Sequence, residues 1–217
     1  MKSVDRHQSS AEIEHAGPEL STGTFRHDLA PDICVPQGQS FVEKCEKLLF
    51  QHFKVPLLRQ AQRLVLESLE HSQGVLATLP TGAGKTLLYA LPALAMSGGP
   101  VLVICPLISL MRDQVRRMRD ANITSVLFTS DQTEEERKQS YSLLFSGKVR
   151  LIFASPERLV LPSFSEALGK VGISMAVVDE AHCVVSWGLG FRPEYADLGK
   201  FLARLRPPKI LALTATA

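Results

Sequence analysis

The chain has 217 residues, 45% of them hydrophobic and 21% charged, so it can form one sizeable globular domain around a single core. Its formal net charge of +2 is too small to indicate a nucleic-acid partner, which therefore has to be inferred from motifs. No run approaches the roughly 18 apolar residues that a membrane span requires, and residues 1–10 do not resemble a signal peptide, so we expect an intracellular protein with no membrane partner.

Residues 1–38 are rich in Ser, Glu, His, Gly and Pro and lack periodicity, which predicts a flexible N-terminal extension before a domain over residues 39–217. From Phe41 onward, apolar residues recur at intervals of three and four. This spacing predicts two amphipathic helices on either side of Pro56.

After Gly74, short apolar runs alternate with longer helical stretches. We predict strands over residues 75–79, 101–105, 125–128, 149–154, 175–179 and 210–214. We predict helices over residues 84–96, 109–120, 133–145 and 193–205. Apolar strands joined by helix-length crossovers indicate a doubly wound α/β domain, with a mostly parallel sheet and helices on both faces.

The four cysteines are scattered and include no CxxC pair. A disulfide framework and a zinc site are therefore not indicated. We expect small, buried or half-buried thiols at all four positions, which are Cys34, Cys45, Cys105 and Cys183.

A glycine-rich segment between a predicted strand and a predicted helix has the context of a phosphate-binding loop. Its backbone N–H groups would hold phosphates, Lys85 would reach the β and γ oxygens, and the Thr86 hydroxyl would bind Mg²⁺. The first glycine of the usual pattern is Leu79 here. The loop consists of Pro80, Thr81, Gly82, Ala83, Gly84, Lys85 and Thr86.

Two acidic residues follow the apolar run 175–178 and should share a sheet edge with Lys85. Asp179 would hold Mg²⁺, and Glu180 would accept a proton from an attacking water. His182 is a candidate for coupling the nucleotide to the next motif. At the end of the last strand, Thr214 and Thr216 could bridge the nucleotide and nucleic-acid sides.

Several further segments resemble the RecQ family of superfamily 2 DNA helicases, over roughly residues 53–217. The most specific part is the box 179–183 together with the sequence that follows it. The segments that carry the resemblance are Pro106-Leu107-Ile108-Ser109-Leu110-Met111-Arg112-Asp113-Gln114, Ser155-Pro156-Glu157-Arg158-Leu159, Asp179-Glu180-Ala181-His182-Cys183, Trp187-Gly188 and Phe191-Arg192-Pro193-Glu194-Tyr195.

The resemblance implies a RecA-like motor domain that uses Mg²⁺ and ATP to drive 3′ to 5′ DNA unwinding in recombination and repair. Arg59 and Gln62 resemble the upstream motif whose glutamine reads the adenine edge, as a bidentate amide can. Many relatives stack an aromatic side chain on the base. The corresponding residue here is Val55.

For DNA, the resemblance implies backbone contacts by Ser109, Ser155 and Arg158, which would position the strand without reading its sequence. It also implies that a loop containing Trp187, Phe191 and Arg192 binds single-stranded DNA, with the two aromatic side chains stacking on bases. In this loop the family usually has His-Asp where the present chain has Leu189-Gly190. Because Leu189 cannot relay hydrogen bonds, we expect weakened or altered DNA stimulation of hydrolysis.

The resemblance further implies a second RecA-like domain after Ala217 that supplies an arginine to the ATP site. Such an arginine contributes about 10³- to 10⁵-fold in rate. We therefore expect the 217-residue chain to bind ATP weakly, to hydrolyse it slowly and not to unwind duplex alone. The alternatives are an ATP- and DNA-binding module, a duplex translocase with impaired unwinding and, more distantly, an RNA helicase; the sequence does not indicate an oligomeric state.

Overall fold

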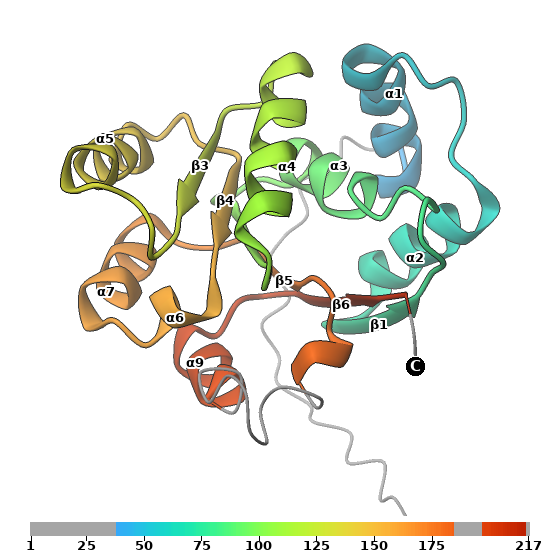
Figure 1. Ribbon diagram of the computed structural model, residues 1–217. Helices are drawn as coiled ribbons and strands as arrows, with labels where there is room; N and C mark the ends of the chain where they lie inside the picture. Colours follow the sequence, from blue (N-terminus) through green and yellow to red (C-terminus); the bar gives the residue numbers. More distant parts are fainter. Residues whose placement is uncertain (1–37, 185–196, 216–217) are drawn as a thin grey trace, which may run out of the picture. The chain divides into compact units, whose positions relative to one another are not determined.

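Short apolar segments form one parallel sheet in the computed structural model, which describes residues 38–184 and 197–215 (Figure 1). The described part of the sheet has six strands in the order β1-β6-β5-β2-β4-β3, and every pairing is parallel. Their bounds are β1 Gly74–Thr78, β2 Val101–Ile104, β3 Ser125–Phe128, β4 Leu151–Ala154, β5 Met175–Val178 and β6 Ile210–Thr214. All their carboxyl ends therefore meet at one edge, where open α/β sheets bind ligands.

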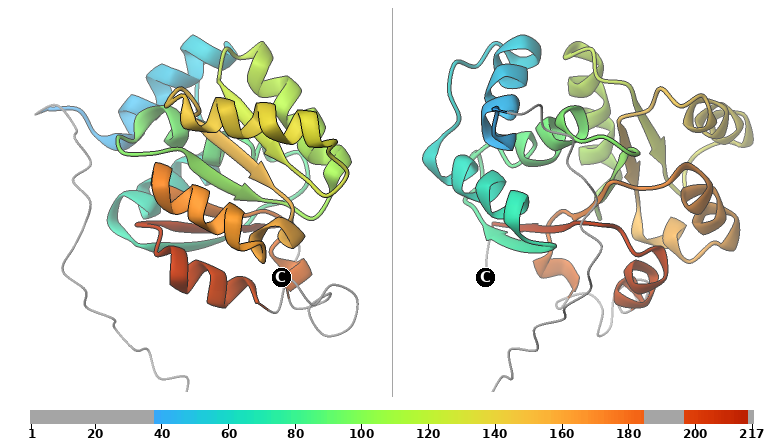
Figure 2. Two further views of the ribbon diagram at one scale, coloured as in Figure 1. Left: turned by 90° about the vertical axis from the view of Figure 1, so that its left-hand side faces the viewer. Right: turned by 180° about the vertical axis from the view of Figure 1, so that it is seen from behind.

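Alternate residues of the central strands enter two separate cores, one on each face of the sheet, whereas β1 and β6 contribute buried residues to the first core. In β2, Val101 and Val103 pack into the first core, whereas Leu102 and Ile104 pack into the second. Strands β2, β4 and β5 are buried throughout. This is the expected result when apolar strands lie between two helical layers (Figure 2).

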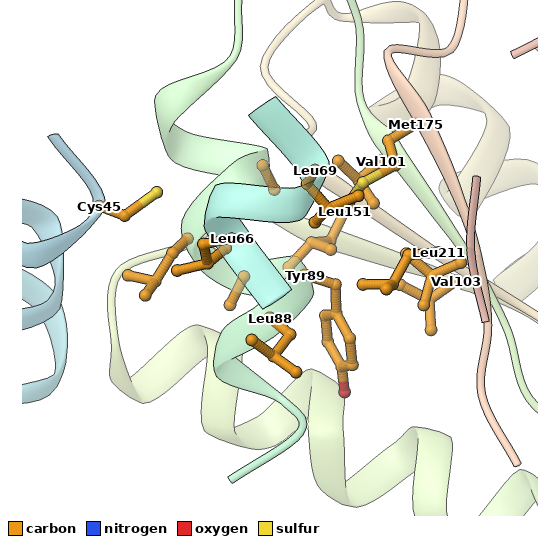
Figure 3. Packing of buried hydrophobic residues seen from close by; sticks show 14 of the residues in the cluster. Cys45, Leu66, Leu69, Leu88, Tyr89, Val101, Val103, Leu151, Met175 and Leu211 are labelled. Atoms are coloured by element: carbon orange, nitrogen blue, oxygen red, sulfur yellow. The ribbon is translucent and has the colours of Figure 1, made fainter. Parts of the chain in front are cut away.

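The first layer supplies buried side chains from α1 Phe41–Phe53, α2 Gln60–His71, α3 Leu87–Ala95 and α4 Ile108–Asp120. Helix α1 begins at a capping box in which Ser40 and Glu43 each bond the other's backbone N–H. Figure 3 shows the Tyr89 ring beside the strand residues Val103 and Leu211, in the same cluster as Leu66 and Leu88. The Tyr89 ring meets the Phe153 ring edge-on, with centroids 6.1 Å apart.

The second layer consists of α5 Glu134–Phe145, α6 Pro156–Leu159, α7 Pro162–Val171 and α9 Leu198–Leu205. Phe128 of β3 anchors it, with its ring centroid 4.9 Å from those of both Tyr141 and Phe164. The α5 helix begins at a second capping box, formed by Thr133 and Glu136.

The prediction of a doubly wound sheet preceded by two helices is confirmed. The predicted helix 84–96 was wrong at its start, because Gly84 has a φ of +79° and the helix begins only at Leu87. Helices α6 and α7 were not predicted. The sequence nevertheless gives a signal for α7: proline at its first position, Phe164, Ala167 and Leu168 at helical spacing, and Gly172 after its end.

Most of the predicted extension 1–38 and part of the predicted helix 193–205 lie outside the described residues. Among the helices that the structure describes, none is long and apolar enough to cross a membrane. Three of the four cysteines, Cys45, Cys105 and Cys183, lie in the described part of the chain. All three are buried, as predicted.

Candidate nucleotide-binding and catalytic site

The loop between β1 and α3 turns back at the carboxyl edge of the sheet. Gly82 and Gly84 both have a φ of +79°, a backbone conformation that residues with a Cβ rarely adopt. Within the loop, the Ala83 N–H donates to the Pro80 carbonyl at 3.1 Å. In the described part of the chain, the N–H groups of Gly82, Gly84, Lys85 and Thr86 have no backbone acceptor. Together with the amino end of α3 and the Lys85 ammonium, these donors suit a polyphosphate.

Two side chains at the amino end of α2 hold this loop through hydrogen bonds. The Gln62 side chain, only 3% exposed, donates from Nε2 to the carbonyls of Ala83 at 2.8 Å and Gly84 at 3.3 Å. Its Oε1 accepts from the Arg59 N–H at 2.9 Å, and the Arg59 guanidinium donates to the Gly82 carbonyl at 2.8 Å. The two residues of the predicted adenine-recognition motif therefore brace the phosphate loop. Recognition of adenine by Gln62 stays a prediction.

Lys85 and Glu180, which are 95 positions apart in sequence, meet at this edge. Lys85 Nζ lies 3.3 Å from Glu180 Oε1, with the two side chains 14% and 23% exposed. His182 Nδ1 lies 3.4 Å from Glu180 Oε2 and 3.1 Å from Thr214 Oγ1. A continuous polar network thus joins the phosphate loop, the acidic box and the end of β6.

The backbone of the acidic box is held in an unusual conformation. Glu180 has a φ of +51°, which is rare for a residue with a side chain. The flanking N–H groups fix it: that of Asp179 donates to the Ile104 carbonyl and that of Ala181 to the Leu213 carbonyl, at 2.9 Å and 2.8 Å. Strain of this kind persists where the surroundings determine the conformation, and it is common at active sites.

Asp179 is the buried carboxylate of the site, with 7% of its surface exposed. Burial raises its pKa above the ordinary value and the Glu180 charge adds to the increase, whereas the Glu180 N–H and Lys85 oppose it. No salt bridge to Asp179 occurs among the described residues. A buried carboxylate without a paired cation, on the same edge as the Thr86 hydroxyl, fits a hard divalent cation such as Mg²⁺.

Two polar side chains at this site had no predicted role. Gln114 of α4 is 8% exposed, and its Oε1 accepts a hydrogen bond from Thr86 Oγ1 at 3.1 Å. Tyr89 is 1% exposed; burial raises the pKa of its phenol, Asp179 adds to this, and the Thr86 hydroxyl opposes it. A sequence signal existed for Gln114, because it interrupts the buried stripe of Met111 and Met118 on an amphipathic helix.

The residues predicted to contact DNA differ in their exposure, and some lie outside the described residues. Ser109 is exposed in the first turn of α4. Ser155 is fully buried and Arg158 is 8% exposed, and among the described residues neither Ser155 Oγ nor Arg158 Nε has a hydrogen-bond partner. Their contacts with DNA stay predictions. The other predicted residues, Trp187, Phe191, Arg192 and Thr216, and the departures at Leu189 and Gly190, lie outside the described residues.

Residues 59–217 match the DEAD/DEAH box helicase family. The chain belongs to this family. It is 40% identical over 159 residues to the ATP-dependent DNA helicase RecQ of Haemophilus influenzae, covering 73% of this chain and 26% of that protein. It is also 40% identical to the ATP-dependent helicase SGS1 of Saccharomyces cerevisiae, covering 78% of this chain and 12% of that protein. The resemblance to RecQ helicases is confirmed.

A further relative is the probable ATP-dependent DNA helicase RecS of Bacillus subtilis, 37% identical over 80% of this chain and 35% of that protein. This chain thus spans about a third or less of the length of these relatives. Among solved structures, Mycobacterium smegmatis helicase Lhr bound to ssDNA and AMP-PNP matches 82% of this chain and 25% of that chain. The TM-score is 0.64 at 22% sequence identity, which shows the shared fold.

Proposed function

We propose that this chain is the first motor domain of a RecQ-type, ATP-dependent DNA helicase. In this proposal it binds Mg²⁺-ATP and single-stranded DNA and, joined to a second RecA-like domain, drives 3′ to 5′ unwinding in recombination and repair. The observation that carries the proposal is the meeting of Lys85 and Glu180, at 3.3 Å, between a loop of free N–H donors and a buried Asp179.

Lys85 is the cation that a bound polyphosphate would attract. Its ammonium pairs with Glu180, and a polyphosphate in the loop would offer it a stronger, more highly charged partner. Moving the ammonium to phosphate would release the Glu180 carboxylate. Substrate binding would thus expose the proposed base only when there is a phosphate to attack.

The released Glu180 would accept a proton from the attacking water. Its position is set by the backbone bonds on both sides and by His182, so it needs little rearrangement to act. Thr86 and Asp179 would hold Mg²⁺, which when bound neutralises charge on the phosphate oxygens. Through His182, the position of Glu180 is linked to Thr214 at the end of β6.

The test is nucleotide binding by the 217-residue chain, followed by ATPase assays on the parent protein with and without single-stranded DNA. We expect Lys85→Ala to abolish binding of a fluorescent ATP analogue. The exposed lysine variant Lys138→Ala is the matched control and should bind as the wild type does. Glu180→Gln should keep binding and lose hydrolysis, which separates the base from the phosphate contacts.

Equal analogue binding by the wild type and Lys85→Ala would refute the proposal. If the parent binds ATP and DNA but its hydrolysis does not exceed that of Glu180→Gln, a binding module is the better description. Leu189→His tests the altered loop separately. A gain of DNA-stimulated hydrolysis in that variant would show that the loop limits coupling.

A further inference from the structure

Helix α4 places a buried amide against the hydroxyl that is proposed to bind the metal. Thr86 Oγ1 donates to Gln114 Oε1 at 3.1 Å, although the two residues are 28 positions apart and Thr86 lies just before α3 whereas Gln114 lies within α4. The neighbouring buried residues of α4 are Met111 and Met118. An amide in such a stripe is costly to bury unless it is hydrogen-bonded, and Thr86 supplies the bond.

A threonine hydroxyl has one proton and two lone pairs, and it rotates to suit its partners. When its proton is donated to Gln114, the oxygen lone pairs remain available to accept a cation. Without an acceptor on α4, the proton could turn toward any other acceptor, the phosphate oxygens included. The lone pairs would then no longer be held ready for the metal.

We propose that Gln114 is a positioning residue that fixes the rotation of the Thr86 hydroxyl so that it can bind Mg²⁺. This inference rests on the proposed nucleotide function and assigns a role to a residue outside the phosphate loop and the acidic box. It also means that a shift of α4 would change the affinity for Mg²⁺, because Gln114 would move with the helix. The exposed Ser109 lies on the same helix, about 7.5 Å along its axis from Gln114.

The test measures the affinity of the 217-residue chain for a fluorescent, non-hydrolysable ATP analogue during Mg²⁺ titration and in EDTA. Gln114→Leu removes the acceptor and keeps the size of the side chain. We expect unchanged affinity in EDTA and an increase of about two- to tenfold in the Mg²⁺ concentration at the midpoint, as for the loss of one hydrogen bond. Gln114→Glu keeps the acceptor and should restore the wild-type midpoint or a lower one.

Two controls separate positioning from packing. Arg116→Ala, on the exposed side of α4, should leave the Mg²⁺ midpoint unchanged. In a Thr86→Ala background, Gln114→Leu should have no further effect on the midpoint, because the hydroxyl that it positions is absent. The melting temperature of each variant without ligand reports any loss of packing.

An unchanged midpoint in Gln114→Leu would overturn the inference. So would an equal loss of affinity with and without Mg²⁺, since that is the result of a purely structural role. Failure of the proposed function looks different: wild type and Lys85→Ala would bind the analogue equally. That result would overturn both the proposed nucleotide function and the role of Gln114.

Discussion

The two phosphate-loop glycines offer a sharp test of how the loop is held. Both have a φ of +79°, so alanine at either position suffers the same conformational strain, about 1 to 2 kcal/mol. Their surroundings differ. A Cβ on Gly82 would meet nothing within 4 Å, whereas a Cβ on Gly84 would lie 2.5 Å from Gln62 Nε2.

Gly84→Ala must therefore displace the Gln62 amide, which then loses its bonds to Ala83 and Gly84 in a site that is 3% exposed. A buried polar group left unsatisfied costs about 1 to 3 kcal/mol. We expect Gly84→Ala to lower the free energy of unfolding by that amount more than Gly82→Ala does. For a chain of this size, each kcal/mol corresponds to about 2 to 4 °C in Tm.

Chemical denaturation of both variants, alone and combined with Gln62→Ala, measures the difference. In the Gln62→Ala background the obstructing amide is gone, so the two alanine substitutions should have similar effects. Equal destabilisation by the two substitutions in the wild-type background would refute the idea that Gln62 clasps the loop. Nucleotide is left out of the assay, so the result does not depend on the proposed function.

Three further predictions concern buried ionisable groups. Burial raises the pKa of Asp179 in the folded state, so the charged form of this side chain destabilises the fold. Asp179→Asn should therefore raise Tm at neutral and alkaline pH. The gain in Tm should fade as the pH falls toward the unfolded-state pKa of the carboxyl. The Lys209 ammonium donates to the carbonyls of Leu69, Glu70 and Ser72 at the end of α2. Lys209→Met should therefore lower the free energy of unfolding, measured by urea denaturation, by about 1 to 3 kcal/mol. Lys200→Met, at an exposed lysine, is the control and should leave it unchanged. Burial raises the pKa of Cys45 and of Cys105 to about 12. After iodoacetamide treatment at mildly alkaline pH, mass spectrometry should find both thiols unmodified in the folded chain and modified in urea. Rapid labelling of the folded chain would contradict their burial.

Local patterns determined much of the fold. The apolar runs that form the strands are short and are separated by helix-length segments, so chain order alone predicted a doubly wound sheet. The glycines and the lysine of the phosphate loop likewise identified its chemistry, because that chemistry depends on adjacent residues. The predicted start of α3 was wrong for a reason that is also local. The left-handed φ of Gly84 delays the helix to Leu87.

Contacts between distant segments were decided only by the tertiary structure. Sequence could place Lys85 and Glu180 on one sheet edge, but only the strand order β1-β6-β5 brings the loop after β1 and the box after β5 to 3.3 Å. The clasp of Gln62 on Ala83 and the bond from Thr86 to Gln114 depend on how α2 and α4 pack against the first face. Side-chain hydrogen bonds require positions correct to a few tenths of an ångström, and residue periodicity carries no information at that scale.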